Sequence, residues 1–119
     1  MNKDIALKIL EINNNNELSY EDKMNQLENI GGASVQIHTN FKTGSNYGKR
    51  NCYILEAYRI LNNFKSREWI DAMNGIKIKP NAVPIEFEII IKDLKQIKYR
   101  LYNSEQVLGF DDNSILQIE

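Results

Sequence analysis

The chain has 119 residues, one cysteine and one histidine, and its 15 basic side chains nearly balance its 16 acidic ones. This length suits one domain with a single hydrophobic core. The lone cysteine excludes an internal disulfide, and no apolar run approaches the roughly 20 residues of a membrane helix. The N-terminus carries acids and lacks a signal peptide's apolar core, so we expect a cytoplasmic protein without membrane contact.

Charge is divided unevenly along the chain. Residues 1–30 hold three basic and six acidic side chains, and residues 101–119 hold four acidic ones and no Lys or Arg. Residues 31–100 hold twelve basic side chains against six acidic ones, so the two ends sum to −7 and the middle to +6. The basic middle predicts a local anion-binding surface rather than a protein that is basic overall.

Residues 1–32 predict a helical hairpin. Apolar residues between Ile5 and Ile12 indicate a short helix, which the run Asn13–Asn16 ends. Ser19 followed by Asp22 resembles the capping box at the start of a second helix. A Gly-Gly pair then stops this helix.

Residues 33–110 predict an α+β core that begins with a strand. Polarity alternates over residues 33–39, which is typical of a half-buried strand and places His38 at the surface or its boundary. A polar loop at 42–46 precedes a helix over Tyr47–Leu61, in which Cys52 is expected as a small buried residue. Ser66 is the expected N-cap of a shorter helix that ends at Met73.

The later part of this core predicts strands. Residues 76–78 alternate in polarity, and a turn between two prolines leads to a hairpin with strands 84–92 and 97–103. The apolar spacing over 90–101 also fits a helix, but the density of β-branched residues favours the hairpin. We therefore expect the α+β class, with helices packed on a small, mainly antiparallel sheet and an acidic tail at 111–119.

The sequence lacks the common motifs of catalysis. A single histidine and a single cysteine exclude His-rich and multi-Cys metal sites. No GxxxxGK[ST] or GxGxxG loop is present. Glu86 and Glu88 share one strand face, where we expect them to be solvated rather than to act as an acid–base pair. We therefore expect no enzyme activity, no metal and no cofactor.

Cations and aromatic rings are interleaved from Tyr47 to Trp69, in the segment YGKRNCYILEAYRILNNFKSREW. This pattern suits a partner with phosphates and exposed bases, and it also suits an amphipathic helix with its rings in the core. We expect Tyr47, Lys49, Arg50 and Asn51 to be functional, because they lie at a loop–helix junction, and Trp69 to be core. Asn51 either contacts a phosphate or base edge or ties the helix to the preceding loop.

Three short segments follow one another in an order known from one protein family. The run Tyr47-Gly-Lys-Arg-Asn51, with Ile54-Leu55 after it, is similar to a YSxxNxxLI pattern, and Trp69 follows downstream. Residues 78–85 stand where a VKKGEKG turn is expected, and residues 101–109 are similar to the phrase VFDVSQTxG. Over about residues 45–110 the chain thus resembles the N-terminal domain of ArdC-type antirestriction proteins.

Some positions depart from the family's pattern. Gly48 replaces the usual Ser, Val107 replaces the usual Thr, and Asn81-Ala82 replace the glycine-bearing turn. Gln106 and Gly109 match. The resemblance therefore implies the family's fold for residues 33–110 more directly than the details of its binding surface.

The resemblance implies a domain that binds single-stranded DNA. In the family this domain precedes a zinc-metallopeptidase-like domain, whose ligands are missing here, so we expect a stand-alone antirestriction or anti-defence protein of a phage, plasmid or conjugative element. Together with the basic middle, it predicts a nucleic-acid site formed by Lys42, Tyr47, Lys49, Arg50, Asn51, Arg59, Arg67, Lys77 and Lys79. Two alternatives stay open: an inhibitor that binds a host defence protein through its acidic ends, and a binder of a small nucleotide signal.

Overall fold

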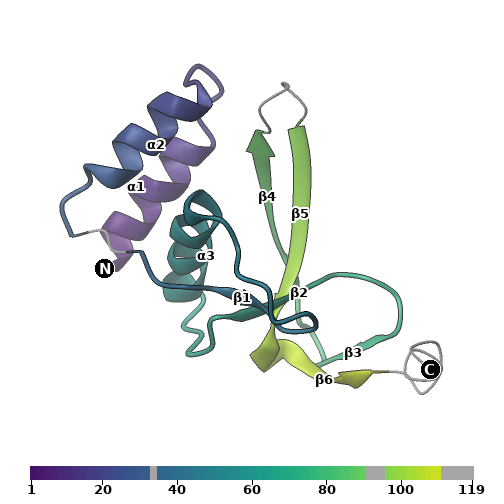
Figure 1. Cartoon of the computed structure of the whole chain (residues 1–119). Helices are drawn as coiled ribbons and strands as arrows, with labels where there is room; N and C mark the ends of the chain where they lie inside the picture. Colours follow the sequence, from purple (N-terminus) through teal and green to yellow (C-terminus); the bar gives the residue numbers. More distant parts are fainter. Residues whose placement is uncertain (33–34, 91–95, 111–119) are drawn as a thin grey trace.

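The computed structural model describes residues 1–32, 35–90 and 96–110, without the side chains of residues 89, 90 and 96. Within these residues it has three α-helices, a four-stranded mixed sheet and a two-stranded antiparallel sheet (Figure 1). The expected α+β class is therefore confirmed. The expected acidic tail at 111–119 lies outside the described residues.

The N-terminal helices form the expected hairpin. Helix α1 spans Lys3–Asn13 and helix α2 spans Tyr20–Glu28. The Ser19 hydroxyl accepts a hydrogen bond from the backbone N–H of Asp22 at 3.1 Å, so the expected cap is confirmed. Three buried side chains of the hairpin, Ala6, Ile9 and Leu27, pack against the third helix.

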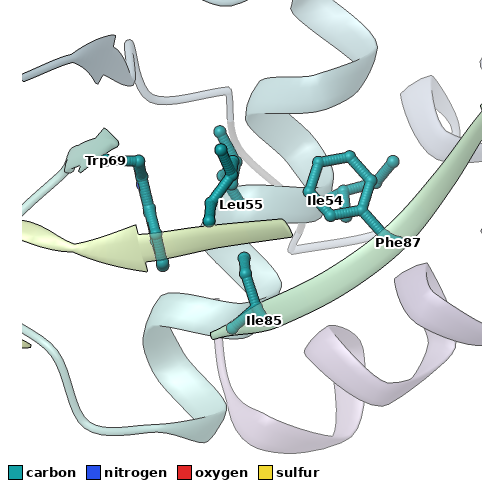
Figure 2. Packing of buried hydrophobic residues seen from close by; sticks show 6 residues of the cluster. Ile54, Leu55, Trp69, Ile85 and Phe87 are labelled. Atoms are coloured by element: carbon teal, nitrogen blue, oxygen red, sulfur yellow. The ribbon is translucent and has the colours of Figure 1, made fainter. Parts of the chain in front are cut away.

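Helix α3, Lys49–Leu61, is the central layer of the molecule (Figure 1). Its Tyr53 and Ala57 are one helical turn apart and face the α1–α2 hairpin. Ile54 and Leu55 point the other way and pack with sheet residues such as Trp69 and Phe87 (Figure 2). Because both faces are covered, the helix is buried without a break from Cys52 to Ala57.

The main sheet has the strand order β1-β2-β5-β4. Its strands are β1 (Thr39–Asn40), β2 (Glu68–Asp71), β5 (Gln96–Asn103) and β4 (Ile85–Ile90). The pair β1–β2 is parallel, with α3 as the connection between the two strands, and the other neighbours are antiparallel. The expected hairpin is thus confirmed as β4–β5, and the helical alternative for 90–101 is wrong over the described part of that range.

A second, two-stranded sheet lies at the C-terminal end of the described chain. Strand β3, Ile76–Ile78, pairs antiparallel with β6, Val107–Phe110. A 3-10 turn, η1 (Ser104–Gln106), connects β5 to β6. The buried side chain of Asn103 accepts a hydrogen bond from the N–H of Glu105 at 3.0 Å and donates one to the backbone oxygen of Ser66 at 2.9 Å, which ties this turn to the start of β2.

The two faces of the β4–β5 pair differ in polarity. Ile85 and Phe87 are buried toward α3, whereas Glu86 and Glu88 are exposed on the opposite face, as expected. Glu86 forms ion pairs there with Arg100 at 2.7 Å and with Lys98 at 3.6 Å. This face is therefore close to electrically neutral.

Two expectations about local structure are wrong. Residues 35–38 form no strand, and β1 contains only Thr39 and Asn40, while residues 33–34 lie outside the described part of the chain. The helix expected from Ser66 to Met73 is instead strand β2. The Ser66 hydroxyl does accept from the N–H of Glu68 at 3.0 Å, as an N-cap does, but the segment continues as a strand because Trp69 and Ile70 are both buried in the sheet region.

Candidate nucleic-acid interface

Two of the expected phosphate-binding arginines share one carboxylate. Glu56, buried on α3, accepts hydrogen bonds from Arg59 at 2.8 and 2.9 Å and from Arg67 at 3.1 and 3.2 Å. Both guanidinium groups thus contact both carboxylate oxygens, which is the strongest geometry for such a pair. Burial raises the pKa of Glu56, but the hydrogen bonds from Arg59 and Arg67 outweigh it and bring the pKa to about 2. The group therefore carries a net charge of only about +1.

His38 contacts the same Glu56 carboxylate from the interior of the protein. It is fully buried rather than at the surface, so that expectation is wrong. The indole N–H of Trp69 donates to its Nδ1 at 2.9 Å, which leaves the ring proton on Nε2, 3.0 Å from Glu56. Burial lowers the pKa of His38 to about 4, although the hydrogen bond with Glu56 opposes this shift. The expectation that Trp69 lies in the core is confirmed.

The start of α3 faces the helical hairpin. Arg50 is 4% exposed, its Nη2 donates to the Asn13 side chain at 2.5 Å, and its guanidinium lies 5.4 Å from the centre of the Tyr20 ring. Lys49 is exposed but pairs with Glu28 of α2 at 2.8 Å. The expected loop–helix junction therefore does not offer Arg50 to a DNA strand in this arrangement.

The other two junction residues lie nearer the surface. Asn51 is partly exposed, one position after Arg50. Tyr47 is half-buried, and its hydroxyl accepts a long hydrogen bond of 3.5 Å from the Asn40 side chain. Burial raises the pKa of the Tyr47 hydroxyl to about 12, so the ring stays neutral.

Three of the expected lysines, Lys42, Lys77 and Lys79, are exposed. Lys42 lies in the loop after β1, where its backbone N–H donates a hydrogen bond of 2.9 Å to the Asn40 side chain and so forms a turn. Lys77 lies on β3, and Lys79 follows directly after this strand. Phe41 stacks on Phe110 of β6 at 6.1 Å between ring centres. Because Phe110 pairs with Ile76, the stack places the loop that carries Lys42 beside the β3–β6 ribbon that carries Lys77 and Lys79.

We call Lys42, Lys77 and Lys79, together with the stacked Phe41 and Phe110, the loop–ribbon surface. Neither phenylalanine was predicted from the sequence as a candidate site residue. An aromatic side chain inside a polar loop, next to Lys42, was the one local signal for Phe41. Nothing local marked Phe110, because its neighbour Phe41 is remote in the chain.

No family model, curated protein or solved structure matches this chain. Over the ranges that the structure describes, no group of three His, Cys, Asp or Glu side chains could hold a metal ion. Over the same ranges, no helix is both long and apolar enough to cross a membrane.

Proposed function

We propose that this protein binds single-stranded DNA and acts as an antirestriction or anti-defence protein of a mobile element. The observation that carries the DNA-binding proposal is the loop–ribbon surface. It combines exposed lysines, which attract phosphates, with a pair of partly exposed aromatic rings, on which bases can stack. The antirestriction role follows from the resemblance to ArdC-type N-terminal domains.

The charge distribution sets how strongly such binding should depend on salt. Each phosphate neutralised on a single strand contributes about −0.7 to the slope of log affinity against log salt. Three exposed lysines therefore predict a slope of about −2. Arg59 and Arg67 together should add less to this slope than two unpaired arginines would, because Glu56 accepts hydrogen bonds from both and compensates one of their two charges.

The test compares two double variants with the same change in charge. Lys42→Ala with Lys77→Ala removes two lysines of the loop–ribbon surface, whereas Lys3→Ala with Lys8→Ala removes two exposed lysines of α1. Fluorescence anisotropy measures the affinity for labelled single- and double-stranded oligonucleotides at several salt concentrations. We expect the first variant to bind single strands several-fold more weakly, with a slope smaller by about 1.4, and the second to resemble the wild type.

Two results would contradict the proposal. One is the absence of single-strand binding by the wild type at low salt. The other is an equal loss in both double variants, which would mean that only overall charge matters. If double strands bound as tightly as single strands, the protein would still bind DNA, but stacking of exposed bases on Phe41 and Phe110 would not contribute to that binding.

A host defence protein is the second candidate partner. Helix α2 carries Glu21 and Asp22 in its exposed first turn, and Glu28 is exposed at its end. Acidic side chains at this N-terminal hairpin could occupy a basic groove on such a partner. This candidate predicts no oligonucleotide binding at low salt and loss of partner capture on charge reversal at Glu21 and Asp22, with the loop–ribbon lysines having no effect.

A further inference from the structure

A polar pocket of about 290 Å³ lies where the turn after α1 meets β4. Figure 1 shows this turn and the far end of β4 at the same end of the molecule, and a hydrogen bond of 3.3 Å from the Asn13 side chain to the backbone oxygen of Glu88 joins them. The polar residues of its lining are Asn13, Asn14, Asn16, Lys23, Glu86, Glu88 and Lys98. None of them belongs to the loop–ribbon surface.

A buried ammonium group forms part of the pocket wall. Lys23 is 1% exposed, and its Nζ donates a hydrogen bond of 2.7 Å to the backbone oxygen of Asn13. An ammonium has three N–H groups, and the described residues accept from one of them. Lys23 therefore keeps donor capacity beside an open polar space.

A second buried cation, Arg50, bonds the same asparagine as Lys23. Arg50 donates to the Asn13 side chain, and its Nε is buried without a hydrogen-bond partner among the described residues. No carboxylate among those residues forms an ion pair with Lys23 or Arg50. Asn13 thus accepts from two positive charges, from Lys23 at its backbone oxygen and from Arg50 at its side-chain oxygen.

Two further interactions offset only part of the free energy that this burial costs. The C-terminal end of α1 favours a cation near Asn13, and the Tyr20 ring favours the guanidinium of Arg50. Burial of charge without an opposite charge is nevertheless unfavourable. Burial lowers the pKa of Lys23, and the charge of Arg50 lowers it further, against the opposing effect of Glu88.

The acidic side chains of the pocket leave room for an anion. Glu86 is already paired with Arg100 and Lys98, so its charge is compensated. Glu88 is exposed, and its backbone oxygen rather than its carboxylate contacts Asn13. The Lys23 ammonium therefore has no ion-pair partner among the described residues, and Asn14 and Asn16, whose side chains can donate hydrogen bonds, line the same pocket.

We propose that this pocket binds a small phosphate-bearing ligand, with Lys23 contacting the phosphate and Arg50 holding Asn13 in position beside it. The volume lies near the lower end of the range for small-molecule sites, which suits inorganic phosphate or a mononucleotide. The site is separate from the loop–ribbon surface. It also gives a role to Asn14 and Asn16, which line the pocket directly after α1.

Two phosphate probes and a matched pair of variants test this site. Lys23→Met keeps the length of the side chain but removes its charge, and Lys8→Met makes the same change at an exposed position of α1. Inorganic phosphate and AMP are titrated separately at constant ionic strength, with sodium chloride as the reference. Binding is followed by calorimetry and by amide chemical shifts.

We expect at least one probe to bind the wild type and Lys8→Met and to shift the amides of residues 13–16 and 23. The affinity of Lys23→Met for that probe should be lower by about tenfold or more, because a charge-assisted hydrogen bond is lost. Tighter binding of AMP would indicate a phosphate ester as the ligand, and binding of inorganic phosphate alone would indicate the free ion.

The proposal is overturned if neither probe shifts these amides in the wild type, or if Lys23→Met binds as tightly as Lys8→Met. The wild-type chemical shifts decide the question even if Lys23→Met does not fold. Single-strand binding by the loop–ribbon surface is measured with other variants, so the two proposals can fail independently.

Discussion

Protonation of His38 should make the stability of this protein depend on pH between about 6.5 and 4. In the folded state its pKa is lowered to about 4, whereas an exposed histidine has a pKa of about 6.5. As the pH falls through this window, the unfolded chain takes up the proton first, so the free energy of unfolding decreases. The stabilisation is present at neutral pH and is lost toward pH 4.

The size of this loss follows from the two pKa values. Between pH 7 and pH 5 the linkage relation gives a decrease of about 2 kcal/mol. Glu56 does not contribute over the same interval, because its pKa of about 2 moves its own effect to the range below about pH 4.5. A loss of this size is a large fraction of the stability of a small domain.

The assay is urea unfolding at both pH values, followed by the fluorescence of Trp69, the single tryptophan. His38→Gln is the comparison, since its amide can accept from Trp69 and donate to Glu56 but does not titrate. We expect the wild type to lose about 2 kcal/mol more than this variant from pH 7 to pH 5. As the sole histidine, His38 also gives an unambiguous NMR titration with an expected midpoint near 4.

Parallel losses of stability in the wild type and His38→Gln would refute this reasoning. So would a titration midpoint near 6.5, which would mean that the imidazole is solvated. An NMR midpoint near 4 together with equal losses of stability in the two proteins would mean that the pKa of His38 is lowered equally in the unfolded chain.

Two further substitutions separate buried from exposed polar contacts. Asn103→Ala removes the side chain that bonds Ser66 and Glu105, and it leaves a partly buried carbonyl and a turn N–H without these partners. It should therefore lower the free energy of unfolding by about 1–3 kcal/mol, measured in urea. A change within error would show that water replaces both bonds. Lys49→Ala removes only an exposed ion pair with Glu28, so its unfolding midpoint should equal that of the wild type, and a clear shift would contradict the weak-pair argument.

The helices and the β4–β5 hairpin could be predicted because their signals are local. Ser19 and Asp22 are three residues apart, and alternation through Ile85 and Phe87 marks the buried face of one strand. Strand β2 could not be predicted in this way. Its four residues follow a serine that bonds as a helix cap does, and only pairing with β1 and β5 makes the segment extended.

The candidate site was predicted less completely because its contacts are remote in the chain. Trp69 lies 31 residues from His38, and Asn13 lies 37 residues from Arg50. Neither pair leaves a pattern in a short window. Arg50 does share a helix face with Tyr53, three residues later. The burial of Arg50 could therefore have been predicted only if it had been known that the N-terminal hairpin covers this face of α3.

The position of the N-terminal hairpin has a consequence for how the chain can be divided. Ala6, Ile9 and Leu27 cover one side of α3, and Asn13 bonds the backbone of β4, which is one of the two edge strands of the main sheet. An unprotected edge strand can pair with a second molecule. A fragment that starts after residue 32 should therefore expose both an apolar helix face and a free strand edge, and should self-associate rather than remain a monomer.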